Sequence, residues 1–338
     1  MKNSTNNNKT IEQLNNKLIK LAFFGTPDYS LIVLESLFAA GFPIVCVVTK
    51  PPRPIGRKQI LTPTPVSVWA EKNKIPVLTP QSYPDKPWLF ASEDETTKQV
   101  LKFQPELLVS ADYTQKIPMS LVEQVKYSGL NIHPSLLPAY RGPAPVPWAI
   151  ANGEKETGVS LVTLAEKFDA GKVIAQEKEK ISPTDTTDSL LTKLFTKGGE
   201  LLIKTLTPPN LPFLKGEESP LFMKERVRVS YYPRLTRDTG FEPWENIKEA
   251  ITTGKEAIRI DRKWRAFHPW PGIWTKIKLK VQSSKFEEKR LKILKLHLTM
   301  NYELRTMNLV LDELQLEGKQ PVSGNHLTEL LSHLNFNP

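Results

Sequence analysis

The hydrophobic residues in the N-terminal part of the chain fall into short continuous runs separated by amphipathic segments. Residues 18–24 and 44–48 are apolar runs, and the segment between them repeats its apolar residues at helical spacing before Gly41. A strand, a helix and a strand within about thirty residues predict a right-handed parallel unit. Similar runs at 107–109 and around Leu130 continue the pattern. The sequence therefore predicts an α/β fold with a parallel-rich sheet.

The same periodicities predict the remaining elements of this first domain. Helices are expected at 66–73, 93–103 and 187–206, and strands at 75–77, 159–163 and 172–177. Prolines and a glycine after Leu206 then mark a linker. The predicted organisation is a disordered lead-in at 1–17, a first domain at 18–206, a linker at 207–223 and a second domain at 224–330.

Beyond the linker the pattern changes to mostly short strands, which indicates a second domain of a different class. Residues 246–258 are predicted to form one helix, and 264–274 form an aromatic segment broken by prolines. In 276–280 the alternation places three lysines on one face, as in an edge strand protected against aggregation. The hydrophobic phase shifts at Asp312-Glu313, which predicts a β-bulge.

Three polar residues lie where a strand end and a later turn can place them in one site. Asn131 and His133 are two residues apart at a predicted strand end, so their side chains point to the same side. The prolines of 134–147 predict a stiff loop without regular structure. Asp169 lies 36 residues after His133 (169 − 133), so only folding can bring the two together. Taken singly, each residue is more typical of a structural role, such as a turn or a hydrogen-bonded strand end.

The complete string changes this interpretation. Residues 131–138 read Asn-Ile-His-Pro-Ser-Leu-Leu-Pro, and Arg141-Gly142 and Asp169-Ala170-Gly171 follow. This string resembles the folate-dependent formyltransferase family. Further stretches resemble the branch that formylates methionyl-tRNA, and the whole resemblance covers about 18–323. These stretches are residues 24–29, 52–57, 64–66, 265–272 and 314–319.

The resemblance implies a Rossmann-like formyltransferase domain followed by a small β-barrel domain of the oligonucleotide-binding type. It implies transfer of the formyl group of 10-formyltetrahydrofolate to the α-amino group of methionine on initiator tRNA. No metal is required. Asn131, His133 and Asp169 are the implied catalytic residues: an oxyanion donor, a proton-transfer group, and a carboxylate that orients the imidazole or holds a relaying water. The implied folate-binding residues are Ser135, Leu136, Leu137, Pro138 and Tyr113.

The charge of the chain suits a nucleic-acid partner. The formal net charge is +10, which favours either a polyanionic partner or simply a solvated basic surface. Residues 50–64 are predicted to be a mobile basic loop, and in the resembled family this insertion enters the acceptor end of the tRNA. The expected tRNA-binding residues are Arg53, Arg57 and Lys58 in this loop and Lys276, Lys278 and Lys280 in the second domain.

One turn departs from the family pattern. Where the family commonly has Ala-Tyr-Gly, this chain has Asp112-Tyr113-Thr114. That turn lies beside the reacting centre in the family, so the change bears on the shape of the folate pocket and on the rate.

Composition excludes several other classes. A single cysteine, Cys46, rules out an internal disulfide, and the five histidines lack the spacing of metal ligands. No apolar run is long enough to span a membrane, and 1–17 fits no secretory or transit signal, so we expect a cytoplasmic monomer. Two alternatives stay open: a relative that formylates an amino sugar or nucleotide or hydrolyses formyl-folate, and a tRNA-binding protein without turnover.

Overall fold

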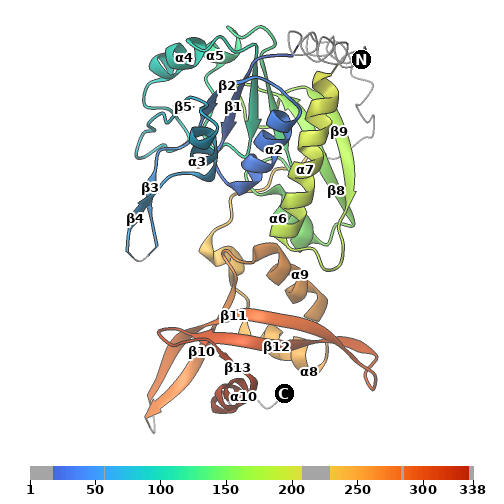
Figure 1. The fold of residues 1–338 in the computed structure, drawn as a ribbon. Helices are drawn as coiled ribbons and strands as arrows, with labels where there is room; N and C mark the ends of the chain where they lie inside the picture. Colours follow the sequence, from blue (N-terminus) through green and yellow to red (C-terminus); the bar gives the residue numbers. More distant parts are fainter. Residues whose placement is uncertain (1–17, 57, 208–228, 283–284, 335–338) are drawn as a thin grey trace, which may run out of the picture. The chain divides into compact units, whose positions relative to one another are not determined.

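The computed structural model describes residues 18–56, 58–207, 229–282 and 285–334, and the chain divides into two compact units (Figure 1). Unit 1 runs to Pro143 and includes Glu156–Lys180 and Leu191–Tyr232; unit 2 comprises Ala144–Lys155, Ile181–Leu190 and the chain from Pro233. The predicted lead-in and nearly all of the predicted linker lie outside the described residues. The predicted domain boundaries stay a prediction.

Unit 1 is built on a seven-stranded sheet with the order β5-β2-β1-β6-β7-β8-β9. The pairs from β5 to β7 are parallel, whereas β8 and β9 are antiparallel, so the predicted parallel-rich sheet is confirmed. The strands are β1 (Leu21–Gly25), β2 (Ile44–Val48), β5 (Val77–Leu78), β6 (Leu107–Ala111), β7 (Gly129–His133), β8 (Glu156–Thr163) and β9 (Val173–Lys180).

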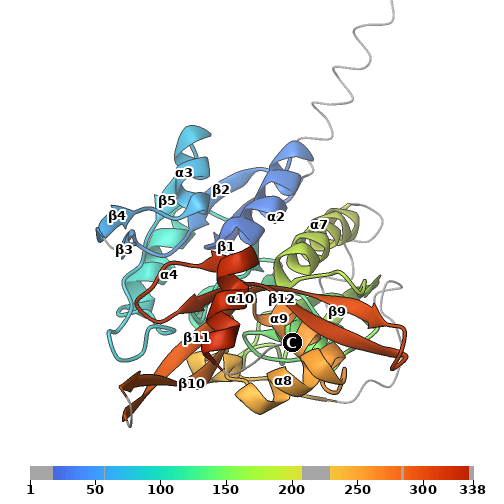
Figure 2. The ribbon, with the colours of Figure 1, turned by 90° about the horizontal axis from the view of Figure 1, so that it is seen from below.

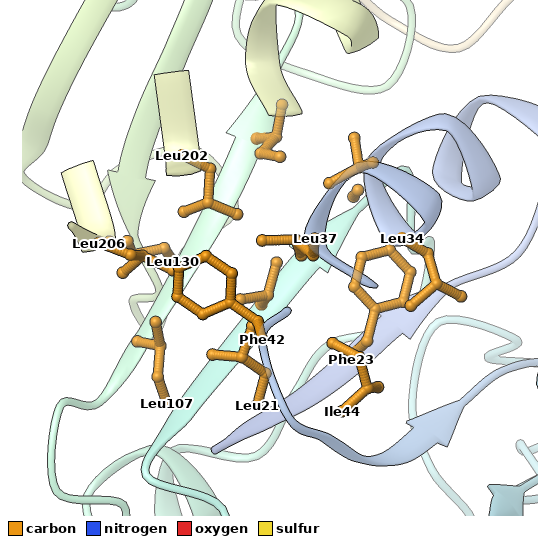
Figure 3. Close-up of a cluster of buried hydrophobic side chains, with 14 of the residues drawn as sticks. Leu21, Phe23, Leu34, Leu37, Phe42, Ile44, Leu107, Leu130, Leu202 and Leu206 are labelled. Carbon is orange, nitrogen blue, oxygen red and sulfur yellow. The ribbon is translucent and has the colours of Figure 1, made fainter. Parts of the chain in front are cut away.

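Helices cover both faces of this sheet, and its central strands are therefore buried on both sides. Leu21 and Phe23 of β1 face a cluster formed with α2, α3 and the part of α7 in unit 1. Figure 3 shows its side chains from β1, α2 and α7. Ala22 and Phe24 alternate to the opposite face and pack with α4 and α5. The helices are α2 (Asp28–Ala39), α3 (Pro65–Lys72), α4 (Glu93–Leu101), α5 (Met119–Val122) and α7 (Thr187–Leu206).

Unit 2 has a four-stranded antiparallel sheet in the order β10-β11-β12-β13. Three helices share its core, and α10 packs against β12 and β13 (Figure 2). A register shift leaves Asp312 between the paired residues Glu313 and Leu311, which confirms the predicted bulge. The elements are α8 (Trp244–Thr252), α9 (Ala257–Phe267), β10 (Ile273–Gln282), β11 (Lys285–Asn301), β12 (Thr306–Leu316), β13 (Val322–Ser323) and α10 (Gly324–His333).

Two predictions about unit 2 were wrong. Residues 246–258 do not form one helix, because Gly254 has a φ of +77° and separates α8 from α9. The strands are not mostly short, since β11 alone spans 17 residues. Charged and aliphatic residues alternate along much of β11. When such a pattern is read in short windows, one long strand resembles several short ones.

Two predicted loops contain regular structure. The basic loop at 50–64 is a hairpin of β3 (Arg53–Ile55) and β4 (Ile60–Thr62), in which Gly56 adopts a φ of +73° in the connection. The proline-rich loop ends in a helix, α6 (Pro145–Asn152), because proline is tolerated in a first helical turn, where its missing N–H has no partner to lose. α5 and α10 were not predicted at all.

The buried face of β1 should dominate the stability of unit 1. Phe23 is fully buried, so Phe23→Ala should lower the free energy of unfolding of this unit by about 3–5 kcal/mol. Urea unfolding followed by fluorescence measures the loss. Phe38→Ala is the matched control because Phe38 is 45% exposed on α2, and its effect should stay well below that of Phe23→Ala. Equal effects would contradict the assignment of the core.

Candidate active site

The candidate catalytic residues lie at the carboxyl ends of the central parallel strands. His133 is the last residue of β7, and the adjacent β6 pairs Ala111 with Ile132, so the turn beginning at Asp112 follows beside it. β1 pairs Gly25 with Ala111 on the other side of β6. The chain proceeds from β1 to β2 in one direction and returns to β6 in the other. The strand order therefore reverses between β1 and β6, beside β7. Open α/β sheets bind their ligands at the carboxyl ends of the strands at such a switch point.

His133 and Asp169 meet in the structure, as their separation in sequence required. The Nδ1 atom of His133 lies 3.3 Å from Oδ1 of Asp169, and both side chains are largely buried. The other ring nitrogen, Nε2, lies 2.9 Å from the carbonyl oxygen of Tyr140. Both partners of the imidazole are acceptors, so both nitrogens must carry protons for the two contacts to be hydrogen bonds.

The second oxygen of Asp169 holds the loop that follows β7. Gly142 N–H donates to Oδ2 of Asp169 over 2.9 Å. Asp169 itself adopts a left-handed φ of +55°, which asparagine and aspartate tolerate better than most residues. One carboxylate therefore contacts both the His133 imidazole and the loop whose carbonyl faces that imidazole.

Asn131 lies two residues before His133 in β7, on the same side of the strand. The flanking residues Leu130 and Ile132 face the opposite side, in the cluster with α7. Asn131 is only half-buried, and its side-chain amide makes no hydrogen bond to any residue in the described part of the chain. Its amide is therefore positioned beside the imidazole and has donors to offer.

Two buried polar side chains of β8 and β9 hydrogen-bond to the loop that follows β7. Ser160 of β8 donates to the carbonyl of Ser135 over 2.6 Å and accepts from Leu137 N–H over 3.0 Å. Gln176 of β9 donates to the carbonyl of Leu137 over 2.9 Å and to Ser160 over 2.8 Å. These bonds occupy backbone groups of the predicted folate-binding stretch within the chain.

The predicted folate-binding residues divide into two groups. Ser135 and Leu137 are buried, and with Leu136 and Pro138 they build the stiff loop between His133 and Tyr140. Tyr113 lies on the neighbouring turn, where its hydroxyl donates to Gln115 over 2.8 Å. Their contacts with folate stay a prediction.

The turn that departs from the family pattern has an unusual polar environment. Burial raises the pKa of Asp112 to about 6, although the positive charge of Lys50 opposes this effect. Asp112 has a φ of +48°. Near it, Thr26 Oγ1, Thr114 Oγ1 and Gln115 Nε2 are buried and have no hydrogen-bond partner among the residues that the structure describes. Unpaired buried groups are costly, so their clustering at strand ends favours a ligand-binding surface here.

The predicted tRNA-binding residues occupy two separate elements. Arg53 in β3 and Lys58 after it are exposed on the hairpin, while Arg57 lies outside the described residues. Lys276 and Lys278 are exposed on β10, an edge strand of its sheet, and Lys276 pairs with Glu288 over 2.8 Å. Lys280 lies in β10, but its side chain is outside the described part.

Comparison with known proteins places this geometry in a family. A formyl transferase family model matches residues 19–206, and a formyl transferase C-terminal domain model matches 248–307. The chain belongs to the formyl transferase family.

Its relatives within that family share a name. The methionyl-tRNA formyltransferase of Halalkalibacterium halodurans is 40% identical over 257 residues, 76% of this chain and 74% of that protein. That of Bacillus cytotoxicus is 38% identical over 259 residues, 76% and 75% of the two chains. The matches make this formyl transferase an enzyme of the transferase class.

Solved structures agree in fold. An N-formyltransferase from Helicobacter canadensis, in complex with folinic acid and dTDP-3-aminofucose, has a TM-score of 0.54 at 19% identity, covering 87% of this chain and 99% of that one. HypX from Aquifex aeolicus has a TM-score of 0.56 at 17% identity, covering 95% of this chain and 49% of that one.

In the described part of this formyl transferase, no helix is long and apolar enough to span a membrane. The same residues include no cluster of three or more His, Cys, Asp and Glu that is placed to hold a metal.

Several groups that hold the candidate site together were not predicted from the sequence. They are the Tyr140 carbonyl, the Gly142 N–H, and the pair of Ser160 and Gln176. Ser160 left a signal, because it interrupts the buried run Val159-Ser160-Leu161 with a polar residue. A backbone carbonyl or N–H leaves none, since every residue but proline carries both.

The close approach at Gly142 gives a test of the loop. A Cβ on Gly142 would lie 2.4 Å from the carbonyl oxygen of Tyr232, and its φ is +104°. Gly142→Ala should therefore displace the loop and reduce formyl transfer at least tenfold. Gly318→Ala is the matched control, because its φ is also positive at +77° but no atom lies within 4 Å of a new Cβ. Similar rates for the two variants would show that the Gly142 contact is unimportant.

The environment of Asp112 predicts a pH-dependent stability. Its folded pKa is raised, so the folded state keeps a proton that the unfolded chain releases between about pH 4 and 6, and the stability falls as the pH rises through that range. Asp112→Asn should therefore be more stable than wild type above pH 6, by up to about 3 kcal/mol, and equally stable near pH 4. Urea unfolding at several pH values measures the difference. A constant difference across the range would contradict the assignment.

Proposed function

We propose that this formyl transferase moves the formyl group of 10-formyltetrahydrofolate to the α-amino group of methionine on initiator tRNA. The observation that carries the proposal is the likeness to methionyl-tRNA formyltransferases over about three quarters of the chain, together with an assembled His133–Asp169 pair. The product, formylmethionyl-tRNA, serves translation initiation, so we place the reaction in the cytoplasm. We retain the prediction of a monomer.

The chemistry is acyl transfer to an amine through a tetrahedral intermediate. The amine needs no activated serine or cysteine, but it must lose a proton, and the departing folate nitrogen must gain one. Imidazole changes its protonation near neutral pH and can perform both transfers. We assign this role to His133, whose Nδ1 is held at 3.3 Å by the Asp169 carboxylate.

The contact between His133 and Tyr140 places a condition on this role. With Nδ1 at Asp169 and Nε2 2.9 Å from the Tyr140 carbonyl, neither nitrogen is left for a substrate. The substrate must therefore take the place of the Tyr140 carbonyl at Nε2. The carboxylate stays in contact with Nδ1 and keeps the ring in its orientation while the other nitrogen exchanges partners.

Asn131 is the donor we assign to the oxyanion of the intermediate. Its amide lies on the same side of β7 as the imidazole and is free of described partners. Loss of one such donor typically costs on the order of 3 kcal/mol, or a hundredfold or more in rate. Asp169 stabilises the imidazolium, which gives its Nε2 proton to the departing folate nitrogen and regains a proton at Nε2 from the attacking amine.

A basic surface gives the tRNA its electrostatic attraction. The net charge of +10 and the exposed Arg53 and Lys58 on the hairpin support this part of the proposal. Arg57, which lies outside the described residues, remains a proposed tRNA contact by its place in the motif, and Lys276, Lys278 and Lys280 remain proposed contacts on β10. Such contacts act mainly through binding and weaken with salt.

The decisive assay is formyl transfer from 10-formyltetrahydrofolate to methionyl initiator tRNA. Wild type should transfer, and His133→Ala should lower kcat by about 10²–10⁴-fold, because general acid–base catalysis contributes that much. Arg53→Ala should raise KM for the tRNA with little change in kcat. If wild type consumes the folate but leaves the tRNA unformylated, the acceptor is a small amine or water, and the tRNA assignment is wrong.

A further inference from the structure

A short segment that follows the predicted linker lies against the catalytic loop of unit 1. Arg141 N–H donates to the carbonyl of Ser230 over 2.9 Å, and Tyr232 N–H donates to the carbonyl of Arg141 over 2.8 Å. Tyr140 N–H donates to Ser230 Oγ over 2.9 Å, and the rings of Tyr140 and Tyr232 stack at 4.6 Å. The segment Ser230–Tyr232 is thus bonded to the loop whose carbonyl contacts His133.

In contrast with its neighbours in this segment, Tyr231 presents its ring to solvent. It is 68% exposed, although its backbone pairs with Arg141 in a parallel bridge. Its ring lies over Gly142, where a Cβ would come within 3.0 Å of Cε2 and 3.2 Å of Cζ. Gly142 is also the residue that donates to Asp169. An exposed aromatic ring therefore lies beside the residue whose N–H donates to Asp169.

Arg141 adds an unpaired donor at the same place. Its Nε is buried and has no hydrogen-bond partner among the described residues. Its backbone is fixed by the bonds to Ser230 and Tyr232, so the start of the side chain is held in place. Arg141 as a whole is only half-buried, and a guanidinium near an exposed ring suits single-stranded nucleic acid, since the bases stack on aromatic rings and the phosphates pair with arginine.

We propose that Tyr231 and Arg141 bind the 3′-terminal nucleotide of the acceptor strand, with its base stacked on the Tyr231 ring and its phosphate paired with Arg141. This rests on the proposed function and specifies how that acceptor is held. The terminal nucleotide carries the methionyl ester, so fixing it one residue from the Tyr140 carbonyl and the Gly142 N–H delivers the α-amine to His133. The gain is positional, because the reacting amine is brought to a prepared site.

The test is a double-mutant cycle between the ring and the base. Full-length protein is assayed with methionyl initiator tRNA and with the same tRNA made abasic at its 3′-terminal nucleotide. In wild type, loss of the base should raise KM about tenfold, since one base–aromatic stack is worth that much or more. Tyr231→Ala should raise KM for the intact tRNA by a similar factor, and the two changes together should cost no more than either alone.

Conservative and matched variants separate stacking from folding. Tyr231→Phe keeps the ring and should behave as wild type. Tyr83→Ala, which removes a tyrosine that is 46% exposed elsewhere in unit 1, should leave KM unchanged. Phe168, 54% exposed and next to Asp169, is the rival platform, and Phe168→Ala should not couple to the base. Unchanged folate binding by Tyr231→Ala shows that the site is intact.

The phosphate contact has its own readout. Arg141→Gln should reduce the slope of log Kd for methionyl-tRNA against log salt concentration by about 0.7–1, the value for one phosphate contact. An unchanged slope would show that Arg141 does not bind a phosphate.

The outcomes separate the inference from the proposed function. If wild type formylates the tRNA but the effects of Tyr231→Ala and the abasic nucleotide add, the ring does not hold the terminal base and the inference is wrong, while the proposed function stands. Coupling at Phe168 instead of Tyr231 also overturns it. If wild type does not formylate methionyl-tRNA at all, the proposed function fails and this inference fails with it.

Discussion

The site of this protein depends on one carboxylate that serves two partners. Asp169 faces Nδ1 of His133 with one oxygen and accepts from Gly142 N–H with the other, at 3.3 Å and 2.9 Å. The first contact orients the imidazole, and the second fixes the loop whose Tyr140 carbonyl contacts Nε2 of the same ring. Charge-assisted contacts of this kind are stronger than neutral ones, so the ring and the loop are held together.

The rest of unit 1 brings these groups together from distant parts of the chain. β7 ends at His133, and the segment after β8 supplies Asp169. Ser160 and Gln176 hydrogen-bond to the loop that follows His133. Ser230 and Tyr232 then fasten the loop from a segment more than sixty residues beyond Asp169 (230 − 169 = 61). The sheet supplies rigidity, and the loops supply function, as is common where a site lies at strand ends.

Much of the fold was predictable from local pattern. The boundaries of β2 and α7 were predicted correctly, because continuous apolar runs and helical spacing are strong local signals. The β3–β4 hairpin and α6 were missed because a basic composition with prolines and glycine indicates a loop, whereas Pro54 lies in a two-stranded ribbon and Pro145 in a first helical turn.

The candidate site was predictable in its side chains and not in its backbone contacts. Asn131 and His133 share a strand side because of the two-residue period, and the resemblance supplied Asp169. The contacts of the Tyr140 carbonyl and the Gly142 N–H could not be predicted from the sequence, because only tertiary structure decides which backbone groups meet a side chain. The same holds for Asp112, whose raised pKa comes from burial.

The most direct test of the shared carboxylate is a nitrogen NMR measurement on histidine-labelled protein without substrate. The structure predicts that Nε2 of His133 carries a proton, because it faces the Tyr140 carbonyl, and that Asp169→Asn changes the Nδ1 signal of this residue most. Addition of the folate and acceptor should then shift the Nε2 signal, while Nδ1 stays in contact with Asp169. A bare Nε2 in the free protein, or a His133 signal unaffected by Asp169→Asn, would contradict the account.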